Sequence, residues 1–229
     1  MKRIVVLTGA GISAESGLKT FRDADGLWEG HDVMAVASPQ GWEKNPGLVL
    51  EFYNQRRRQL KNAWPNAAHL ALAKLEEKFH VNIVTQNVDN LHEKAGSSKV
   101  LHLHGELFKV RSTVDENYIL DWEEDLCEGD FCKYNSQLRP HIVWFGEAVP
   151  MLEKAASLVE KAHILIIVGT SMQVYPAAGL VDFVSPETPI YFVDPKPAVS
   201  PTKNLKVIAK KASVGVPDLV EKLIGQVNL

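Results

Sequence analysis

The chain has 229 residues, of which 45% are hydrophobic and 23% charged, and its 25 basic and 28 acidic side chains give a formal net charge of −3. This composition is typical of a soluble globular protein of one large domain, with room for a small insert, and it disfavours nucleic acid or a membrane surface as the main partner. The two cysteines, Cys127 and Cys132, are too few for a secreted disulfide framework, and no targeting or membrane-spanning segment is evident, so we expect a cytoplasmic protein, and a monomer.

Six short apolar, β-branched runs bounded by Gly, Asn or Pro are predicted to be buried strands: residues 4–7, 81–85, 100–103, 164–168, 190–193 and 206–208. Helical spacing predicts helices over residues 46–60, 66–79, 89–95, 151–161, 176–183 and 217–224. Strands that alternate with helices predict an α/β fold with a parallel sheet covered on both faces.

Two segments interrupt this alternation. Residues 21–42 are rich in Gly, Asp, Ser and Pro and are expected to form a mobile loop, anchored by Leu27 and Trp28. Residues 109–140 are charged and contain both cysteines, so we expect a small lobe inserted into the sheet domain.

The first strand leads into Gly9-x-Gly11-x-x-Ala14, a pattern typical of dinucleotide-binding turns. Gly9 permits a tight turn, Gly11 lets the backbone approach a pyrophosphate, and a helix beyond would offer N–H groups to its charge. A plain tight turn before a helix is the alternative. An ordinary dehydrogenase would place an acidic residue at the end of a second strand about 20 residues later. This chain has the 21–42 loop there, so a nucleotide site is expected without hydride transfer.

Five motifs resemble the sirtuins in order and spacing: GAGISAESGLKTFRD at 9–23, TQNVDNLH at 85–92, HLHGE at 102–106, VWFGE at 143–147, and GTS with YPAA at 169–178. The resemblance implies one catalytic domain over 1–229, with a Rossmann-like core (about 1–20, 81–108 and 141–229), a cofactor loop (21–42), a helical segment (46–79) and a small lobe (109–140). It also implies that NAD is consumed to remove acyl groups from lysine side chains of proteins, giving nicotinamide and O-acyl-ADP-ribose.

The resemblance assigns NAD contacts to several separate segments. Asn87 and Asp89 follow a strand, where they are alternatively N-caps of the next helix, and Ser171 is alternatively a helix cap. Arg22 is alternatively an ordinary surface arginine, and Asp194 stands where the family usually has asparagine. The expected NAD-binding residues are Gly9, Ala10, Gly11, Ile12, Ser13, Ala14, Thr20, Phe21, Arg22, Trp28, Gln86, Asn87, Val88, Asp89, Gly169, Thr170, Ser171, Asp194, Pro195, Lys196 and Ala212.

His102 and His104 alternate along a strand and are expected to share a face. Each is alternatively a hydrogen-bonded core histidine, and no third ligand at a supporting spacing indicates a metal site. The resemblance implies that His104 is the catalytic general base and His102 its structural neighbour. An imidazole with a pKa near ~6.5 can accept a proton from a ribose hydroxyl at neutral pH.

Two further segments are expected to bind the acylated substrate. The resemblance implies that residues 143–147, with Val143, Phe145, Gly146 and Glu147, and the loop near Val174 and Tyr175 hold the peptide between them by β-strand addition. The 143–147 segment is alternatively a core strand. Tyr53 and Arg56 lie three residues apart, so a helix would place both on one face. Alternatively, Tyr53 packs in the interior and the Arg56–Arg58 run is a solvated surface. The Tyr-x-x-Arg spacing resembles that of sirtuins that remove succinyl, malonyl or glutaryl groups, with acetyl a weaker substrate.

The small lobe departs from the family pattern, in which two cysteine pairs hold zinc. Ser112 stands where a thiolate is expected, and Cys127 and Cys132 are separated by four residues. We therefore expect no zinc or other metal, although Asp, Glu or His ligands are an alternative. An apolar cluster is expected instead, drawn from Tyr118, Ile119, Leu120, Trp122, Leu126, Phe131, Tyr134 and Leu138. Competing functions are a dehydrogenase, a non-catalytic NAD or ADP-ribose module, and an ADP-ribosyltransferase.

Overall fold

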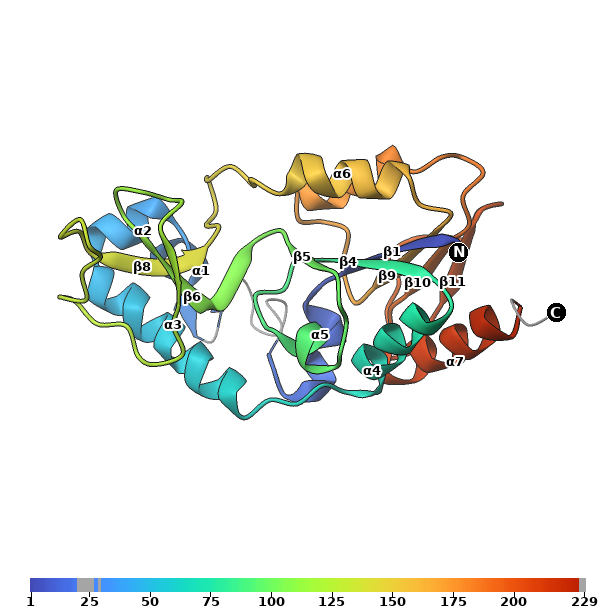
Figure 1. Ribbon diagram of the computed structural model, residues 1–229, viewed down its shortest axis with the longest axis horizontal. Helices are drawn as coiled ribbons and strands as arrows, with labels where there is room; N and C mark the ends of the chain where they lie inside the picture. Colours follow the sequence, from blue (N-terminus) through green and yellow to red (C-terminus); the bar gives the residue numbers. More distant parts are fainter. Residues whose placement is uncertain (20–26, 29, 227–229) are drawn as a thin grey trace.

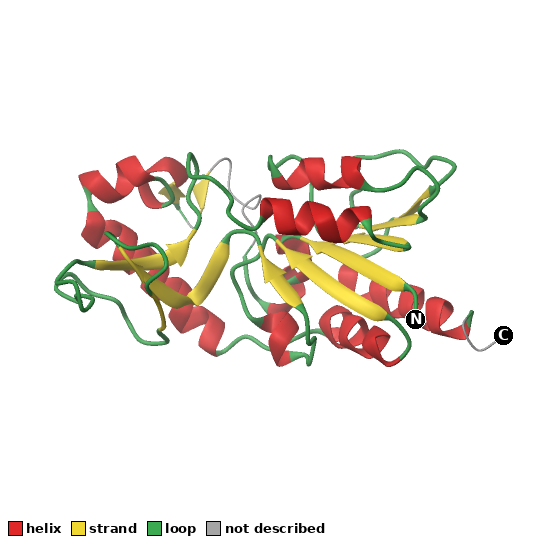
Figure 2. Ribbon diagram, turned by 45° about the horizontal axis from the view of Figure 1, so that its top comes forward, coloured by secondary structure: helices red, strands yellow, loops and turns green. Residues whose placement is uncertain are grey.

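A computed structural model describes residues 1–19, 27–28 and 30–226 of the chain. Its main body is built on a six-stranded, all-parallel sheet in the order β11-β10-β9-β1-β4-β5 (Figures 1 and 2). All six predicted strands are present, and the α/β, Rossmann-like prediction is confirmed. Their bounds are β1 (Arg3–Thr8), β4 (His80–Thr85), β5 (Val100–His102), β9 (Ile164–Val168), β10 (Ile190–Val193) and β11 (Leu205–Ile208).

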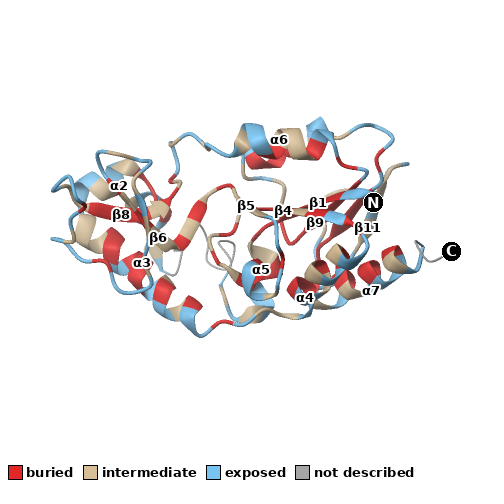
Figure 3. Ribbon diagram, viewed as in Figure 1, coloured by how far each residue is buried: buried red, intermediate tan, exposed pale blue. Residues whose placement is uncertain are grey.

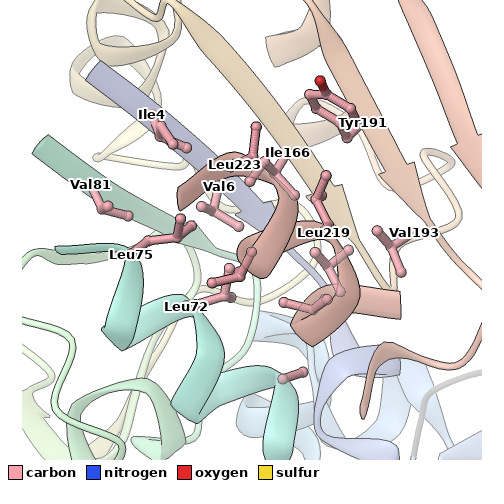
Figure 4. Packing of buried hydrophobic residues seen from close by; sticks show 14 of the residues in the cluster. Ile4, Val6, Leu72, Leu75, Val81, Ile166, Tyr191, Val193, Leu219 and Leu223 are labelled. Carbon is pink, nitrogen blue, oxygen red and sulfur yellow. The ribbon is translucent and has the colours of Figure 1, made fainter. Parts of the chain in front are cut away.

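Both faces of the sheet are buried in the middle because the inner positions of the central strands β1 and β9 are apolar (Figure 3). Ile4 lies beside Val81 on one side and Ile164 on the other, so their side chains share a face. Helices α4 (Ala67–Lys74) and α7 (Ala212–Gly225) cover this face, and Figure 4 shows Leu72 and Leu219 packed against it. The opposite face packs against α6 (Leu152–Glu160) and the 3₁₀ segment η4 (Ala177–Phe183).

A smaller lobe lies at the other end of the molecule (Figure 1). Its antiparallel sheet has the order β7-β6-β8 and packs against three helices, chiefly the long α3. Its elements are α1 (Val33–Val36), α2 (Pro39–Lys44), α3 (Pro46–Lys61), β6 (Gly105–Ser112), β7 (Ile119–Asp121) and β8 (Leu138–Ile142). The predicted helical segment 46–79 is thus divided: α3 belongs to the lobe, whereas α4 and η3 (Leu75–Glu77) lie under the main sheet.

Several predicted boundaries were wrong. The expected helix does not begin directly after the glycine-rich turn. Two 3₁₀ turns, η1 (Ala10–Ile12) and η2 (Ala14–Ser16), occupy this place. The predicted loop 21–42 contains the short paired strands β2 (Leu27–Trp28) and β3 (His31–Asp32), then α1 and α2, because Asp32 and Ser38 cap these helices. Helix α5 (Leu91–Lys94) is shorter than predicted. Helix α7 begins five residues early, where the Glu15 carboxylate accepts hydrogen bonds from the backbone N–H and hydroxyl of Ser213.

The lobe has an apolar cluster that differs in part from the prediction. Leu126 and Leu138 are buried in it, with Leu50, Val110 and Cys132 as additional members. Of the other predicted residues, Tyr118, Leu120 and Trp122 pack against it, but Ile119, Phe131 and Tyr134 are exposed. Ile119 is exposed because it alternates with Leu120 along β7 and so faces outward. None of the helices in the described ranges is long and apolar enough to cross a membrane.

Candidate active site between the sheet and the lobe

A cavity of about 710 Å³ lies where the carboxyl ends of the main-sheet strands face the lobe. Open α/β sheets bind ligands at this edge. The predicted site residues that line it are Gly9, Ala10, Gly11, Ser13, Ala14, Tyr53, Arg56, Gln86, Asn87, Val88, Asp89, His104, Val143, Phe145, Gly146, Glu147, Gly169, Thr170, Ser171, Asp194, Pro195, Lys196 and Ala212. Segments distant in sequence therefore meet around one space.

Five expected NAD-binding residues are not placed in the cavity. Ile12 is fully buried in the core beneath the sheet, so its side chain does not line the cavity. Thr20, Phe21 and Arg22 lie outside the described residues. Trp28 belongs to β2, and only its backbone is described.

The glycine-rich loops after β1 and β9 touch each other directly. The Gly11 N–H donates to the Gly169 carbonyl at 2.8 Å, and the Gly9 N–H donates to the Val168 carbonyl at 3.1 Å. A Cβ atom at Gly11 would lie 2.7 Å from the Gly169 Cα, closer than carbon atoms can pack. Gly169 itself has a φ of +60°, in the left-handed region that favours glycine. Backbone atoms of Gly11 and Gly169 therefore meet at the floor of the cavity, where the sequence predicts the pyrophosphate site.

A buried polar network forms one wall. The Ser13 hydroxyl donates to Asp89 Oδ2 at 2.9 Å, and Asn87 Nδ2 donates to Ser13 Oγ at 3.1 Å. Asp89 Oδ1 accepts a hydrogen bond from the Leu91 backbone N–H at 3.1 Å. Asp89 therefore also caps the first turn of α5, which was the alternative role predicted for it. Burial raises the pKa of Asp89, while the Leu91 and Ser13 hydrogen bonds lower it. These bonds fix the orientation of the wall before a ligand enters.

The two histidines hydrogen-bond to consecutive backbone carbonyls. His104 Nδ1 lies 3.1 Å from the Gln86 oxygen, and a carbonyl only accepts, so Nδ1 carries the proton and Nε2 carries the lone pair. Burial lowers the pKa of His104, and the Gln86 bond opposes this effect. The imidazole is therefore neutral at pH 7 and able to accept a proton at Nε2 in the cavity.

His102 is held differently and does not line the cavity. Its Nδ1 lies 2.9 Å from the Asn87 oxygen and its Nε2 lies 2.8 Å from Glu93 Oε1, so both ring nitrogens face acceptors. Burial lowers the pKa of His102, but the Glu93 hydrogen bond and charge outweigh it, and the pKa is raised. His102 thus braces the segment that contains Asn87.

Tyr53 and Arg56 lie one turn apart on α3 and both line the lobe side of the cavity. Tyr53 Oη accepts a hydrogen bond from the Trp144 indole at 3.1 Å, and burial raises the Tyr53 pKa. The half-buried Arg56 donates to the Phe52 carbonyl at 3.1 Å, and its guanidinium stacks 4.0 Å from the centre of the Phe52 ring. The next two arginines differ: Arg57 is fully buried and donates to Leu107 O, whereas Arg58 is exposed and paired with Glu51.

The segment 143–147 borders the cavity, but its polar groups are used inside the protein. The backbone N–H groups of Val143 and Phe145 donate to the carbonyls of His104 and Ala37, each at 2.9 Å. Strand addition by a peptide cannot use these two donors. The Glu147 carboxylate lies 2.7 Å from Arg139 and 3.2 Å from Arg111, so this side chain ties the segment to β6 and β8.

The two cysteines of the lobe lie in different surroundings. Cys132 is buried with its Sγ 3.3 Å from the Ser112 hydroxyl, whereas Cys127 is exposed. Ser112 Oγ also accepts the Val114 and Asp115 backbone N–H groups at 3.1 and 3.3 Å. Across residues 1–19, 27–28 and 30–226, no three His, Cys, Asp or Glu side chains gather as a metal would require.

Some lining residues had not been singled out from the sequence. Trp144 lies inside the recognised motif at 143–147, so its neighbourhood was a usable signal. Lys19 lies inside the recognised motif at 9–23, whereas no local pattern distinguishes the lining residues Gln59 and Lys211.

Comparison with known proteins places this arrangement in a family. The Sir2 family profile matches residues 9–176. A protein of Helicobacter pylori (strain ATCC 700392 / 26695) named NAD-dependent protein deacylase is 61% identical over 225 residues, 98% of each chain. A protein of Bacteroides thetaiotaomicron with the same name is 52% identical over 231 residues, 98% of this chain and 99% of the relative.

Solved structures of Sir2 homologues have a similar fold. An ADP-ribose complex of the S24A mutant of a Sir2 homologue has a TM-score of 0.90 at 39% identity, covering all of this chain and 94% of that one. The NAD complex of a Sir2 homologue has a TM-score of 0.88 at 40% identity, covering 98% of this chain and 90% of that one. The cavity, its glycine floor and its histidine thus belong to a chain that is a member of the Sir2 family, the sirtuins.

Proposed function

We propose that this sirtuin removes acyl groups from lysine side chains of proteins with consumption of NAD, and that it prefers the acidic acyl groups succinyl, malonyl and glutaryl over acetyl. The observation that carries the preference is the shared position of Tyr53 and Arg56 in the cavity that also contains His104. The chemistry is supported by the relatives, which are named NAD-dependent protein deacylases.

The acyl preference follows from charge. A carboxylate at the far end of the acyl group accepts hydrogen bonds from the Arg56 guanidinium and the Tyr53 hydroxyl. A hydrogen bond to a charged group contributes about 1.5–3 kcal/mol, which corresponds to roughly one to two decades in selectivity. An acetyl group is too short to make these contacts, so it remains a weaker substrate.

The chain's residues supply positioning and proton transfer. When bound, NAD supplies a ribose carbon from which nicotinamide leaves and to which the acyl oxygen bonds. His104 Nε2 accepts the proton of a ribose hydroxyl, and the Ser13, Asn87 and Asp89 network orients the ribose and nicotinamide. The lobe and the sheet enclose the cavity between them, which limits hydrolysis by water.

The proposal has a wider context. We infer a cytoplasmic monomer whose partners are acylated proteins, not nucleic acid or membranes, from the net charge of −3 and the cysteine usage. We also infer a lobe that folds without zinc, because its contacts are Ser112 to Cys132 and the apolar cluster around Leu126.

The decisive test is steady-state kinetics on one peptide carrying succinyl, malonyl, glutaryl or acetyl lysine, with NAD. The wild type should show a kcat/KM for succinyl at least about ten-fold above that for acetyl. Tyr53→Phe combined with Arg56→Met should collapse this ratio. The matched control is Arg58→Met on the exposed side of the same helix, which should leave the ratio unchanged.

Other outcomes assign other functions. An unaltered succinyl-to-acetyl ratio in the Tyr53/Arg56 double variant would contradict the acyl preference. Nicotinamide release that requires the acylated peptide and is lost in His104→Ala would exclude a non-catalytic binding module. Transfer of labelled ADP-ribose to protein without loss of the acyl group would indicate an ADP-ribosyltransferase instead.

A further inference from the structure

Trp144 connects the edge of the cavity to Tyr53. Its indole Nε1 donates a hydrogen bond to Tyr53 Oη at 3.1 Å, across 91 residues of sequence. Both side chains border the cavity, yet Trp144 is only 2% exposed and Tyr53 is fully buried. The bond is therefore shielded from water, which strengthens it and makes its loss costly.

The position of Trp144 is fixed from several sides. The Arg139 guanidinium lies 3.3 Å from the centre of the indole ring, and the Trp42 ring packs at 5.8 Å. Arg139 is held by Glu147 at 2.7 Å, and Glu147 also accepts the Trp144 backbone N–H at 2.8 Å. The ring cannot turn without breaking this set of contacts, so the direction of its N–H is set by the fold.

This geometry determines how the Tyr53 hydroxyl is oriented. An indole N–H can only donate, so the Tyr53 oxygen is the acceptor and the phenolic proton points away from Trp144. Burial raises the pKa of Tyr53, so the phenol keeps its proton. A carboxylate can only accept, and it therefore requires Tyr53 as a donor. Loss of the indole N–H removes this constraint on the hydroxyl, so its orientation is less well set before the acyl carboxylate binds.

We propose that Trp144 is a positioning residue for acyl specificity, which presents the Tyr53 hydroxyl as a hydrogen-bond donor to the distal carboxylate of an acidic acyl group. The proposal rests on the proposed function, because it needs the acidic acyl group to reach Tyr53. It predicts that the Trp144 N–H affects binding of succinyl-lysine through Tyr53 and not through the reaction at His104.

The test compares Trp144→Phe, Tyr53→Phe and the double variant, with KM and kcat for succinyl- and acetyl-lysine forms of one peptide. We expect Trp144→Phe to raise the succinyl KM about five-fold and lower the succinyl-to-acetyl ratio of kcat/KM by a similar factor, while kcat for succinyl changes less than about two-fold. In the Tyr53→Phe background the same change should have little further effect, because the acceptor is gone. The matched control is Trp122→Phe, a tryptophan that packs against the lobe cluster outside the cavity lining, which should leave the succinyl KM unchanged.

A second replacement separates the N–H from packing. Incorporation of 3-benzothienyl-L-alanine at position 144 keeps the ring shape and exchanges the N–H for sulfur, and it should reproduce the succinyl effect of Trp144→Phe at an unchanged melting temperature. Equal succinyl KM values for this protein and the wild type, or additive effects in the double variant, would overturn the proposal. A wild type that shows no preference for succinyl would instead overturn the proposed function. A preference that is lost in Tyr53→Phe but intact in both Trp144 proteins would overturn this inference alone.

Discussion

The contact between the two glycine loops predicts a strong effect of Gly11→Ala. The new Cβ would lie 2.7 Å from Cα, 2.8 Å from O and 3.0 Å from C of Gly169, all backbone atoms that no side-chain rotation can move. Carbon atoms pack at about 3.5 Å or more, so the loops would have to separate by about 0.8 Å. The Gly11 to Gly169 hydrogen bond of 2.8 Å would then exceed the usual limit and be lost.

These distances set the size of the destabilisation expected for Gly11→Ala. Losing one hydrogen bond and straining a packed contact should lower the free energy of unfolding by about 1–3 kcal/mol. For a chain of this size the melting temperature would fall by roughly 2–4 °C per kcal/mol. Because the same backbone forms the floor of the proposed pyrophosphate site, KM for NAD should rise at least about ten-fold.

Urea denaturation and NAD titration of the purified variant measure both effects. The matched control is Gly225→Ala at the exposed end of α7, where a Cβ meets nothing within 4 Å and alanine should stabilise the helix by up to about 1 kcal/mol. A Gly11→Ala protein with wild-type urea midpoint and wild-type KM for NAD would refute the reasoning, because it would mean that the loops do not touch as described.

Three further predictions concern stability. Glu147→Gln should lower the free energy of unfolding by about 1.5–3 kcal/mol, because Arg139 lies 2.7 Å away with the side chain of Glu147 only 20% exposed. Arg139 and the other partners hold the Glu147 pKa below its usual 4.5 despite burial, so the stabilisation by the ion pair is present above pH 4.5 and is lost as pH falls below it. If Glu147→Gln lowered the free energy of unfolding equally at pH 3 and pH 7, the pairing would be contradicted. Burial lowers the pKa of His69 to about 4 and that of His92 well below 6.5, so the unfolded chain binds more protons, and the free energy of unfolding should fall below pH 6.5 by about 1.4 kcal/mol per pH unit for each histidine. In urea titrations at several pH values, His69→Gln should flatten this dependence of the free energy of unfolding on pH. An unchanged dependence would rule this prediction out. Chelation with 1,10-phenanthroline should leave the melting temperature unchanged, and metal analysis that finds one tightly bound zinc per chain would contradict a lobe without zinc.

Local signals in the sequence account for most of the main body. The β-branched runs predicted all six strands, because strands buried on both faces, such as β1 and β9, are rich in apolar residues along most of their length. The glycines of the first turn and Asp89 after β4 were predicted to be near a ligand, because their chemistry is visible within a few residues. Helix ends were predicted less well: α7 begins where Glu15, 198 residues away from Ser213, supplies a hydrogen-bond partner.

The packing of the lobe could not be predicted from local sequence. Its sequence is charged and irregular, and which aromatic residues face inward depends on the pairing of β7 with β6, so Ile119 and Leu120 could not be separated in advance. The burial of Arg56, Arg57 and Arg58 likewise depends on which face of α3 meets β6 and which meets the cavity. The sequence by itself determined the α/β fold, because its strands are marked by residues close together in the chain; it also predicted a nucleotide-binding turn and, by resemblance, the candidate base His104. Only the tertiary structure decided that Trp144 meets Tyr53 and that Glu147 is held by Arg139, because the folding of the lobe against α3 brings these distant side chains into one packed interior.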